Sequence, residues 1–506
     1  MTLTPANDGT RQRSDLDVCQ PKRALRHAQN RHTPPKDCCC RRPCHQSSSD
    51  ARAIHTAINS DTNCLSFDEK SKKKKGKLLR YRTIGVALLA IASLLVTVPP
   101  AGATTPSRMV SVAQVAAGLT DAKPQPAKAL GTVTPTPTPN CSAVTANMAA
   151  YAKTGVQQVL CVSEVNPSSP PAATSDDVKA AAWCSGEEAQ TWWITRDETC
   201  IHGITVVYTV TQVPSGAVLG TATFSFDHEV RLSTTDTVID DDAAATLIAS
   251  SGVLAAPVAS FSATCSSPCA AQDGVGFALE TFSRGETQDA FFSYADAPVS
   301  RADLFNSTYT FTVVPPPNTV PVNPSVSWST PANLFRCDDL VTAFDGCVIP
   351  AYTPELQVSV SRHQAAAIGI AVAQSLPDGW GSTVELTRLA DESAAEPNRR
   401  KICEDGTWVK RADVRDDSCD EYAFARSRQS GGQLGLTGID CAEIVPWFDE
   451  TDGQWYFEAI RFTGQERCLR AHVPLDENSL VGSDLGGLTT SARLIDNDKY
   501  WVGVYN

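Results

Sequence analysis

Apolar and polar residues alternate through much of the first half of the chain. Residues 203–213 read GITVVYTVTQV, residues 217–226 place Ala222, Phe224 and Phe226 at every second position, and Pro-Ser-Gly lies between the two runs. Two β-rich runs across such a break predict a hairpin. Shorter strand-like runs follow at 274–281, 307–314 and 326–329. The pattern predicts an antiparallel, sandwich-like β-rich module over residues 141–353.

The period of the pattern changes after residue 354. Ile368, Val372 and Leu376 recur at every fourth position, which is typical of one face of a helix. Ser361 is expected to cap the N-terminus of this helix, and Pro377-Asp378-Gly379 to end it. We expect the helix to open a small α+β domain over residues 354–506, with His363 as an exposed residue of its first turn.

A basic segment and then an apolar segment precede the β-rich module. Four lysines at 72–75 lead to the run 84–98 (IGVALLAIASLLVTV), and small residues follow at 101–103. This order predicts a signal peptide over residues 77–103, and therefore a secreted, extracellular protein. An uncleaved membrane anchor is the alternative, although the run is shorter than the ~20 apolar residues that a spanning helix needs.

Charge divides the chain at the end of this segment. Residues 1–103 carry 18 basic and 8 acidic side chains, whereas residues 104–506 carry 25 basic and 48 acidic ones. Residues 1–76 are predicted to be an unstructured basic extension, and a translation start further along the chain is left open. Residues 104–140 are rich in Ala, Thr and Pro and end in TPTPTP at 134–139. This composition predicts an extended linker that builds no core and acts as a spacer from the cell surface.

Twelve cysteines lie beyond the predicted signal peptide, and an even number in an exported chain favours disulfide bonds. Cys265 and Cys269 could be half of a zinc site, but no second pair has zinc-finger spacing, so a small-loop disulfide is predicted. Cys337 and Cys347 are predicted to form a second local disulfide. The remaining connectivity cannot be deduced from spacing.

Three tryptophans of the β-rich module, Trp183, Trp192 and Trp193, have two interpretations. Aromatic rings can stack on sugars, which would give this module a cell-wall or polysaccharide partner, whereas packing in the core is the more common use of Trp in a β-domain. The sequence leaves both interpretations open. A serine hydrolase is disfavoured, because the chain has no Gly-x-Ser-x-Gly motif.

Several motifs follow one another between residues 361 and 506. The helix beginning at His363 is followed by Leu386-Thr-Arg-Leu389 and Asn398-Arg399-Arg400, then by Cys419-Asp420-Glu421-Tyr422, Val473-Pro-Leu-Asp-Glu-Asn478 with Gly482, and Arg493-Leu-Ile-Asp-Asn-Asp498. In this order the motifs resemble the NucA/NucB deoxyribonuclease family, in its long secreted form. The resemblance extends upstream to about residue 336.

The resemblance implies a small domain of the ββα-metal type that hydrolyses phosphodiester bonds of DNA without sequence specificity. It implies that Asp420, Glu421 and Asn478 are catalytic, that these three and Glu477 bind Mg²⁺ or Mn²⁺, and that phosphate is bound by Arg399 and Arg400. Carboxylate and amide oxygens are suited to such hard ions, and a carboxylate can also take a proton from the attacking water. We expect DNA as the substrate partner, a monomer and no nucleotide cofactor; the choice between DNA and RNA is left open.

Three positions depart from the family pattern. Ala423 replaces a proline, Gln429-Ser430 replaces a glutamate before a glycine pair, and Glu477 replaces an aspartate. If the missing glutamate belonged to the metal site, this site would have one carboxylate fewer. Residues 357–506 also carry 15 basic and 24 acidic side chains, which predicts contact with few phosphates. The alternative function is a catalytically inactive nuclease fold that serves as an extracellular binding or adhesion module.

Overall fold

The computed structural model describes residues 108–115, 119, 125–136, 140–167, 183–341 and 344–506. All of these residues belong to one compact unit, Pro99–Asn506. The extension predicted at 1–76 and the signal peptide predicted at 77–103 lie outside the described residues. Within the described ranges, no helix combines the length and the apolarity that crossing a bilayer requires.

The largest sheet in the described residues is built on the predicted hairpin. Long strands β5 and β6 pair in antiparallel register, with Tyr208 opposite Ala222 and Val206 opposite Phe224, so the hairpin prediction is confirmed. The sheet order is β14-β3-β5-β6-β7-β11-β9, with β4 joined to β5 and β2 joined to β4. Its strands are β2 (Lys128–Thr132), β3 (Gln158–Val165), β4 (Thr191–Ile194), β5 (Glu198–Gln212), β6 (Val218–Leu232), β7 (Val238–Gly252), β9 (Ala270–Asp273), β11 (Thr287–Ala295) and β14 (Thr319–Pro321). Two short helices, α2 (Cys141–Ala146) and α3 (Met148–Lys153), precede β3.

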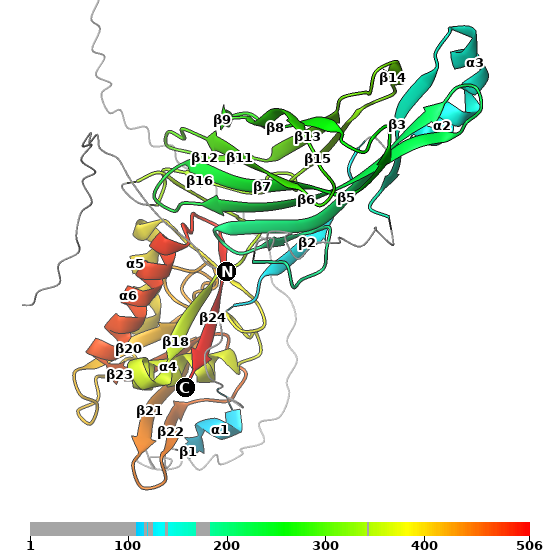
Figure 1. Ribbon diagram of the computed structural model, residues 1–506. Helices are drawn as coiled ribbons and strands as arrows, with labels where there is room; N and C mark the ends of the chain where they lie inside the picture. The colour runs from blue at the N-terminus through cyan, green and yellow to red at the C-terminus, as the bar shows by residue number, and fades with distance from the viewer. Residues whose placement is uncertain (1–107, 116–118, 120–124, 137–139, 168–182, 342–343) are drawn as a thin grey trace, which may run out of the picture. The chain divides into compact units, whose positions relative to one another are not determined.

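A second sheet of four strands packs over the first, as Figure 1 shows. Three of its strands, β10 (Val275–Thr281), β13 (Ser307–Val313) and β15 (Ser325–Ser329), agree with the predicted runs, and the fourth is β8 (Val258–Cys265), which was not predicted. Apolar residues at alternate positions of both sheets meet in one core, in which Phe224, Phe261 and Phe311 are fully buried. Trp192 also lies in this core, whereas Trp183 is exposed and Trp193 is half-buried. The core interpretation therefore holds for Trp192.

All twelve cysteines from Cys141 onward form disulfides. The predicted bonds Cys265–Cys269 and Cys337–Cys347 are both confirmed. The other pairs are Cys141–Cys161, Cys184–Cys200, Cys403–Cys419 and Cys441–Cys468. Because such a density of disulfides persists only under oxidising conditions, it supports an extracellular location. Cys337–Cys347 joins β16 (Phe335–Asp338) to β17 (Gly346–Val348), in a small sheet completed by β12 (Ala302–Phe305).

The C-terminal part contains two further sheets and its own core. A five-stranded sheet has the order β1-β22-β21-β23-β20, and a three-stranded sheet has the order β18-β24-β19. The strands are β1 (Arg108–Ser111), β20 (Asp417–Tyr422), β21 (Ala442–Asp449), β22 (Gln454–Arg461), β23 (Leu469–Pro474), β18 (Glu355–Ser359), β19 (Leu386–Thr387) and β24 (Lys499–Tyr505). The helices are α1 (Val112–Val115), α4 (Val360–Gln374), α5 (Glu392–Cys403), a 3-10 turn at Gly438–Asp440 and α6 (Leu475–Ser491). The chain is thus β-rich with several sheets, as predicted.

Helix α4 is present where it was predicted, but its start differs. Ser359 is the N-cap residue, two residues earlier than the expected Ser361. Ser375 is the C-cap residue and lies shortly before Pro377. The expectation that His363 is exposed was wrong. His363 is buried, because its Nδ1 lies 3.0 Å from Ser359 O and its Nε2 lies 2.9 Å from Asp484 Oδ2 of α6.

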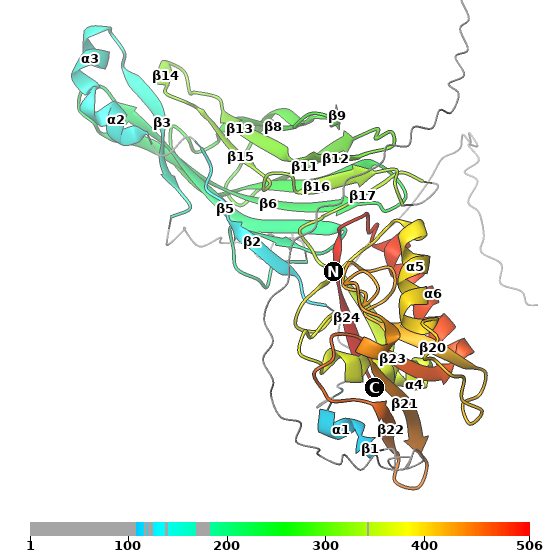
Figure 2. The same cartoon turned by 180° about the vertical axis from the view of Figure 1, so that it is seen from behind.

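The segment predicted as a spacer also differs from the prediction where it is described. Strand β1 pairs with β22, with Val110 opposite Phe457, and both Val110 and Val112 are buried in the C-terminal core. Figures 1 and 2 both show β1 beside β22. Strand β2 pairs with β4 of the large sheet. The segment was misread because Met109-Val110-Ser111-Val112 is too short an alternation to stand out in a Thr- and Pro-rich context.

Buried ion pairs connect the β-rich module to the end of the chain. Arg493 reaches Asp338 of β16 at 2.7 Å, and both side chains are fully buried. Two arginines of the β-rich module, Arg196 and Arg336, bind Asp498 at 3.1 Å and 2.8 Å. A buried pair that loses one partner leaves an uncompensated charge, so these contacts hold the loop between α6 and β24 in place.

Candidate functional site

Strand β20 presents the two adjacent carboxylates predicted to be catalytic. It is the last strand of its sheet among the described strands, and strand alternation directs Asp420 and Glu421 to opposite faces. A cavity of about 410 Å³ at this edge is lined by both residues. We call it the carboxylate cavity. Its walls come from α5, β20, the segment after β20 and α6. The lining residues are Arg399, Ser418, Cys419, Asp420, Glu421, Phe424, Ala425, Arg426, Leu475, Asn478, Ser479, Val481, Gly482 and Leu485.

A disulfide sets the position of Arg399 against Glu421. Arg399 and Cys403 are four residues apart on α5, so they lie on one face of the helix. Cys419 and Glu421 are two residues apart on β20, so they lie on one face of the strand. The Cys403–Cys419 bond joins these two faces with a Cα–Cα distance of 5.8 Å. As a result, Arg399 Nε lies 3.3 Å from Glu421 Oε1.

Asp420 is a buried carboxylate without a partner. Its side chain belongs to a residue that is only 7 % exposed, and it makes no hydrogen bond or ion pair with any of the described residues. Burial, together with the nearby charge of Glu421, raises the pKa of Asp420 well above its ordinary value, and Arg399 offsets only part of this. A buried carboxylate in this state either holds a proton or requires a cation from outside the chain.

Glu421 is buried as well, and the negative charge of its carboxylate is only partly balanced by the positive charge of Arg399. Burial raises the pKa of Glu421, and the charge of Arg399 acts in the opposite direction. Arg470 stands directly opposite Glu421 in the pairing of β20 with β23. Its guanidinium is instead bound to Glu443 at 2.7 Å and to Asp405 at 3.2 Å. The strand partner of Glu421 therefore does not neutralise it.

Asn478 enters the carboxylate cavity from the first turn of α6. Its Nδ2 donates to Ser418 Oγ and to Cys419 O, both at 3.2 Å. These two bonds fix the orientation of the amide, and no described residue donates to its Oδ1. Ser418 in turn donates to Val473 O at 2.9 Å. Ser418 thus positions Asn478, a role that sequence reasoning missed; its spacing of two residues from Asp420, on the same strand face, was the available signal.

Two predicted site residues do not join the cavity. Glu477 Oε2 accepts a hydrogen bond from the backbone N–H of Ala365 in α4 at 2.8 Å, so its carboxylate is occupied inside the helix pair. Helix geometry explains the difference, because consecutive residues such as Glu477 and Asn478 point about 100° apart. Arg400 lies on the outer side of α5, where it pairs with Glu396 at 3.1 Å. The structure therefore brings together Asp420, Glu421, Asn478 and Arg399.

The departures from the family pattern lie outside the lining. Gln429 bridges to β19, accepting from Thr387 N at 2.8 Å and donating to Thr387 Oγ1 at 3.1 Å. Ser430 is buried and accepts a hydrogen bond from Gln433 N. Ala423 is buried in the C-terminal core, so packing holds the turn after β20 in place.

The donor set of the cavity fits a hard divalent cation that keeps part of its water shell. Two carboxylates and an amide oxygen are available, and Mg²⁺ in proteins is commonly held by one or two carboxylates together with water and substrate oxygens. Cys403 Sγ, Cys419 Sγ and a Glu421 oxygen also lie within 4.8 Å of one another, but the two sulfurs form a disulfide and are not thiolate ligands. Among the described lining residues there is no histidine, so only the carboxylates can accept a proton.

Comparisons with known proteins add no relative. No family model, no curated protein and no solved structure matches this chain.

Proposed function

We propose that the chain is a secreted, metal-dependent endonuclease that hydrolyses phosphodiester bonds of DNA without sequence specificity. The observation that carries the proposal is the state of Asp420: a buried, unpartnered carboxylate beside Glu421 in a cavity that also contains Asn478 and Arg399. Such a group costs stability, and its retention makes sense where an external cation restores the balance. The motifs that resemble the NucA/NucB family contribute these four residues.

Asp420, Glu421 and the Oδ1 of Asn478 would hold Mg²⁺ or Mn²⁺. When bound, the ion would supply positive charge to the phosphate oxygens and lower the pKa of a bound water. Arg399 is suited to the phosphate itself, because its side chain is 56 % exposed; its Nε is engaged with Glu421, and its Nη1 has only a long contact of 4.0 Å with Glu396.

The proton chemistry follows from the difference between the two carboxylates. Arg399 binds Glu421 and favours its ionised form, whereas Asp420 has no hydrogen-bonded partner among the described residues. Asp420 is therefore the better acceptor for the proton of the attacking water. The water oxygen forms a bond to phosphorus, the bond from phosphorus to the departing sugar oxygen breaks, and that oxygen takes a proton from solvent.

The β-rich module is proposed as the support of this site. Its arginines Arg196 and Arg336 hold Asp498, which follows α6, and α6 forms one wall of the carboxylate cavity. Trp183 is exposed, so the proposal includes a contact of the β-rich module with cell-wall polysaccharide. The protein is proposed to act as a monomer.

The test is cleavage of plasmid DNA by the pure protein with its disulfides intact. We expect nicking with Mg²⁺ or Mn²⁺, loss of nicking with chelator, and loss in the double variant Asp420→Asn with Glu421→Gln. Asp413→Asn is the matched control, because Asp413 is an exposed carboxylate bound to Arg411 outside the cavity. Intact DNA after incubation of the wild type with either metal would refute the proposal and favour the inactive binding module.

A further inference from the structure

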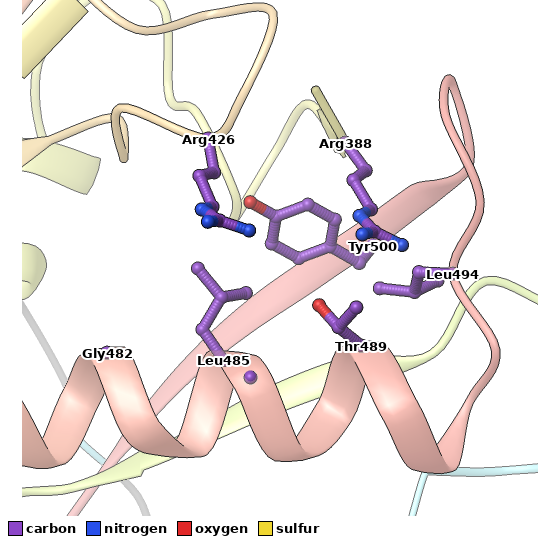
Figure 3. Close-up of a pocket in the computed structure, with 8 residues that line it drawn as sticks. Arg388, Arg426, Gly482, Leu485, Thr489, Leu494 and Tyr500 are labelled. Carbon is purple, nitrogen blue, oxygen red and sulfur yellow. The ribbon is translucent and has the colours of Figure 1, made fainter. Parts of the chain in front are cut away.

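A second, smaller cavity lies next to the carboxylate cavity. It has a volume of about 140 Å³ and is called here the arginine cavity, after Arg388 and Arg426 in its wall. Arg426, Gly482 and Leu485 line both cavities, so the two are adjacent along α6. Figure 3 shows the two guanidinium groups on either side of the Tyr500 ring, facing α6. No carboxylate is among the described lining residues.

Backbone pairing brings the two arginines together. Arg388 forms an antiparallel bridge with Ser427, Leu389 N donates to Arg426 O at 2.9 Å, and Arg428 N donates to Thr387 O at 2.9 Å. This pairing places Arg388 beside Arg426 although the two are far apart in sequence. Two like charges held side by side repel each other, which is unfavourable unless an anion binds between them.

The carboxylates nearest to Arg388 are engaged with other groups. Asp498 is bound by Arg196 and Arg336 of the β-rich module, and Asp496 is bound by Arg428 at 2.6 Å. In the described residues, the guanidinium of Arg388 makes no hydrogen bond and no salt bridge. Burial, and then the charge of Arg426, lowers the pKa of Arg388. Arg426 has one partner, Glu392 at 2.6 Å, in an exposed pair of the kind that contributes little.

Tyr500 adds an unpartnered donor to the same cavity. The residue is 1 % exposed, and its hydroxyl is buried without a hydrogen-bond partner in the described structure. A buried hydroxyl without a partner is destabilising, and a bound acceptor would relieve this cost. The cavity thus combines a free guanidinium, a second guanidinium and a hydroxyl, all of them donors.

We propose that the arginine cavity binds a phosphate of the DNA strand adjacent to the phosphate that is cut, with Arg388, Arg426 and the Tyr500 hydroxyl as donors. This inference rests on the proposed function, because the neighbouring carboxylate cavity supplies the cut. Guanidinium groups bind phosphate oxygens through pairs of hydrogen bonds. Three donors in a wall whose described residues include no carboxylate favour an anion, and the one carboxylate paired with Arg426, that of Glu392, is exposed and outside this lining. Gly482 of α6 lines both cavities, and a Cβ at this position would stand in open space, which the glycine leaves free.

The experiment compares Arg388→Gln and Tyr500→Phe with Arg467→Gln, an exposed arginine paired with Asp378 away from both cavities. Binding of a fluorescent DNA oligonucleotide to the full chain is measured in chelator at low salt, with inorganic phosphate as competitor. We expect Arg388→Gln to weaken binding about tenfold or more and Tyr500→Phe several-fold, while Arg467→Gln stays within about twofold of the wild type. With metal, Arg388→Gln should raise KM for DNA, whereas Arg467→Gln should leave it unchanged.

The outcomes separate this inference from the proposed function. Equal oligonucleotide binding by Arg388→Gln and Arg467→Gln would overturn the inference, even if the wild type cleaves DNA. If inorganic phosphate competes with the oligonucleotide but Arg388→Gln does not change oligonucleotide binding, the inference would also be overturned. That result would indicate a site for small anions only. If Arg388→Gln weakens oligonucleotide binding but the wild type does not cleave DNA, the phosphate site would be supported and the endonuclease proposal refuted. Thermal unfolding of Tyr500→Phe checks folding, because removing an unpartnered hydroxyl should not lower stability.

Discussion

Replacing Asp420 with asparagine should stabilise the metal-free protein at neutral pH while removing cleavage. The carboxylate is buried, has no partner among the described residues, and has a pKa raised by burial and by Glu421. Because the folded pKa lies above that of the unfolded chain, ionisation opposes folding. The cost is absent below the unfolded pKa of about 4, grows as the pH rises towards the folded pKa, and is complete above it.

The expected size of the effect follows from burial. A buried polar group without partners costs about 1–3 kcal/mol, and more when charged. Asparagine is also unpartnered at this position but carries no charge, so we expect a gain of about 1–2 kcal/mol. At about 2–4 °C per kcal/mol, the melting temperature should rise by about 2–8 °C.

The assay is thermal unfolding in chelator at about pH 4 and about pH 8, with added Mn²⁺ as a further arm. The difference between Asp420→Asn and the wild type should be largest at the higher pH, and Mn²⁺ should stabilise only the wild type. Asp413→Asn is the control, since Arg411 lowers the pKa of Asp413 to about 2. Asp413 is then ionised in the fold at both pH values, and its replacement should lower stability slightly and by a similar amount at each. Equal or lower stability of Asp420→Asn at both pH values would refute the reasoning, because Asp420 would then be favourably solvated in the fold.

Four further predictions follow from the structure. Cys403→Ser with Cys419→Ser should cost about 3 kcal/mol of unfolding free energy and should also lower kcat, because Arg399 is no longer held against Glu421. An unchanged kcat would contradict the role of the disulfide in positioning Arg399. Gly482→Ala should raise stability by up to about 1 kcal/mol, because a Cβ there meets no atom within 4 Å, yet should raise KM for DNA. Asp338→Asn should cost about 3–5 kcal/mol in denaturant unfolding, because it removes the buried carboxylate that pairs at 2.7 Å with the fully buried Arg493. The dependence of log KM for DNA on log salt should be shallow, with a slope of about 2–3; a slope near 10 would indicate a much larger phosphate contact.

Local patterns were sufficient to predict much of the β-rich module. The hairpin of β5 and β6 follows from alternation and a turn sequence, and the end of α4 follows from Pro377. The spacer prediction failed because β1 is stabilised by β22, a strand more than 300 residues away, and not by its own composition. His363 was misassigned for the same reason, since its burial depends on Asp484 of α6.

The candidate site was predictable where neighbours in sequence are neighbours in space. Asp420 and Glu421 share one strand, and the motif order brought in Asn478 and Arg399. Glu477 could not be separated from Asn478 without knowing the rotation of α6. The adjacency of Arg388 and Arg426 depends on pairing between distant backbone segments, which no local pattern encodes.

Local charge explains how an acidic domain could engage DNA in the proposed function. Residues 357–506 carry a net negative charge, yet the walls of the two cavities hold three arginines, Arg388, Arg399 and Arg426, against the two carboxylates. A divalent cation on Asp420 and Glu421 would make the walls of the two cavities strongly positive. This is where the cut phosphate and its neighbour would bind. Away from it, the acidic surface repels the duplex at distances up to the Debye length of about 8–10 Å. Affinity would then depend on the metal and on the arginine cavity, and Arg196 and Arg336 of the β-rich module would assist by binding the Asp498 carboxylate, whose backbone lies beside Arg388.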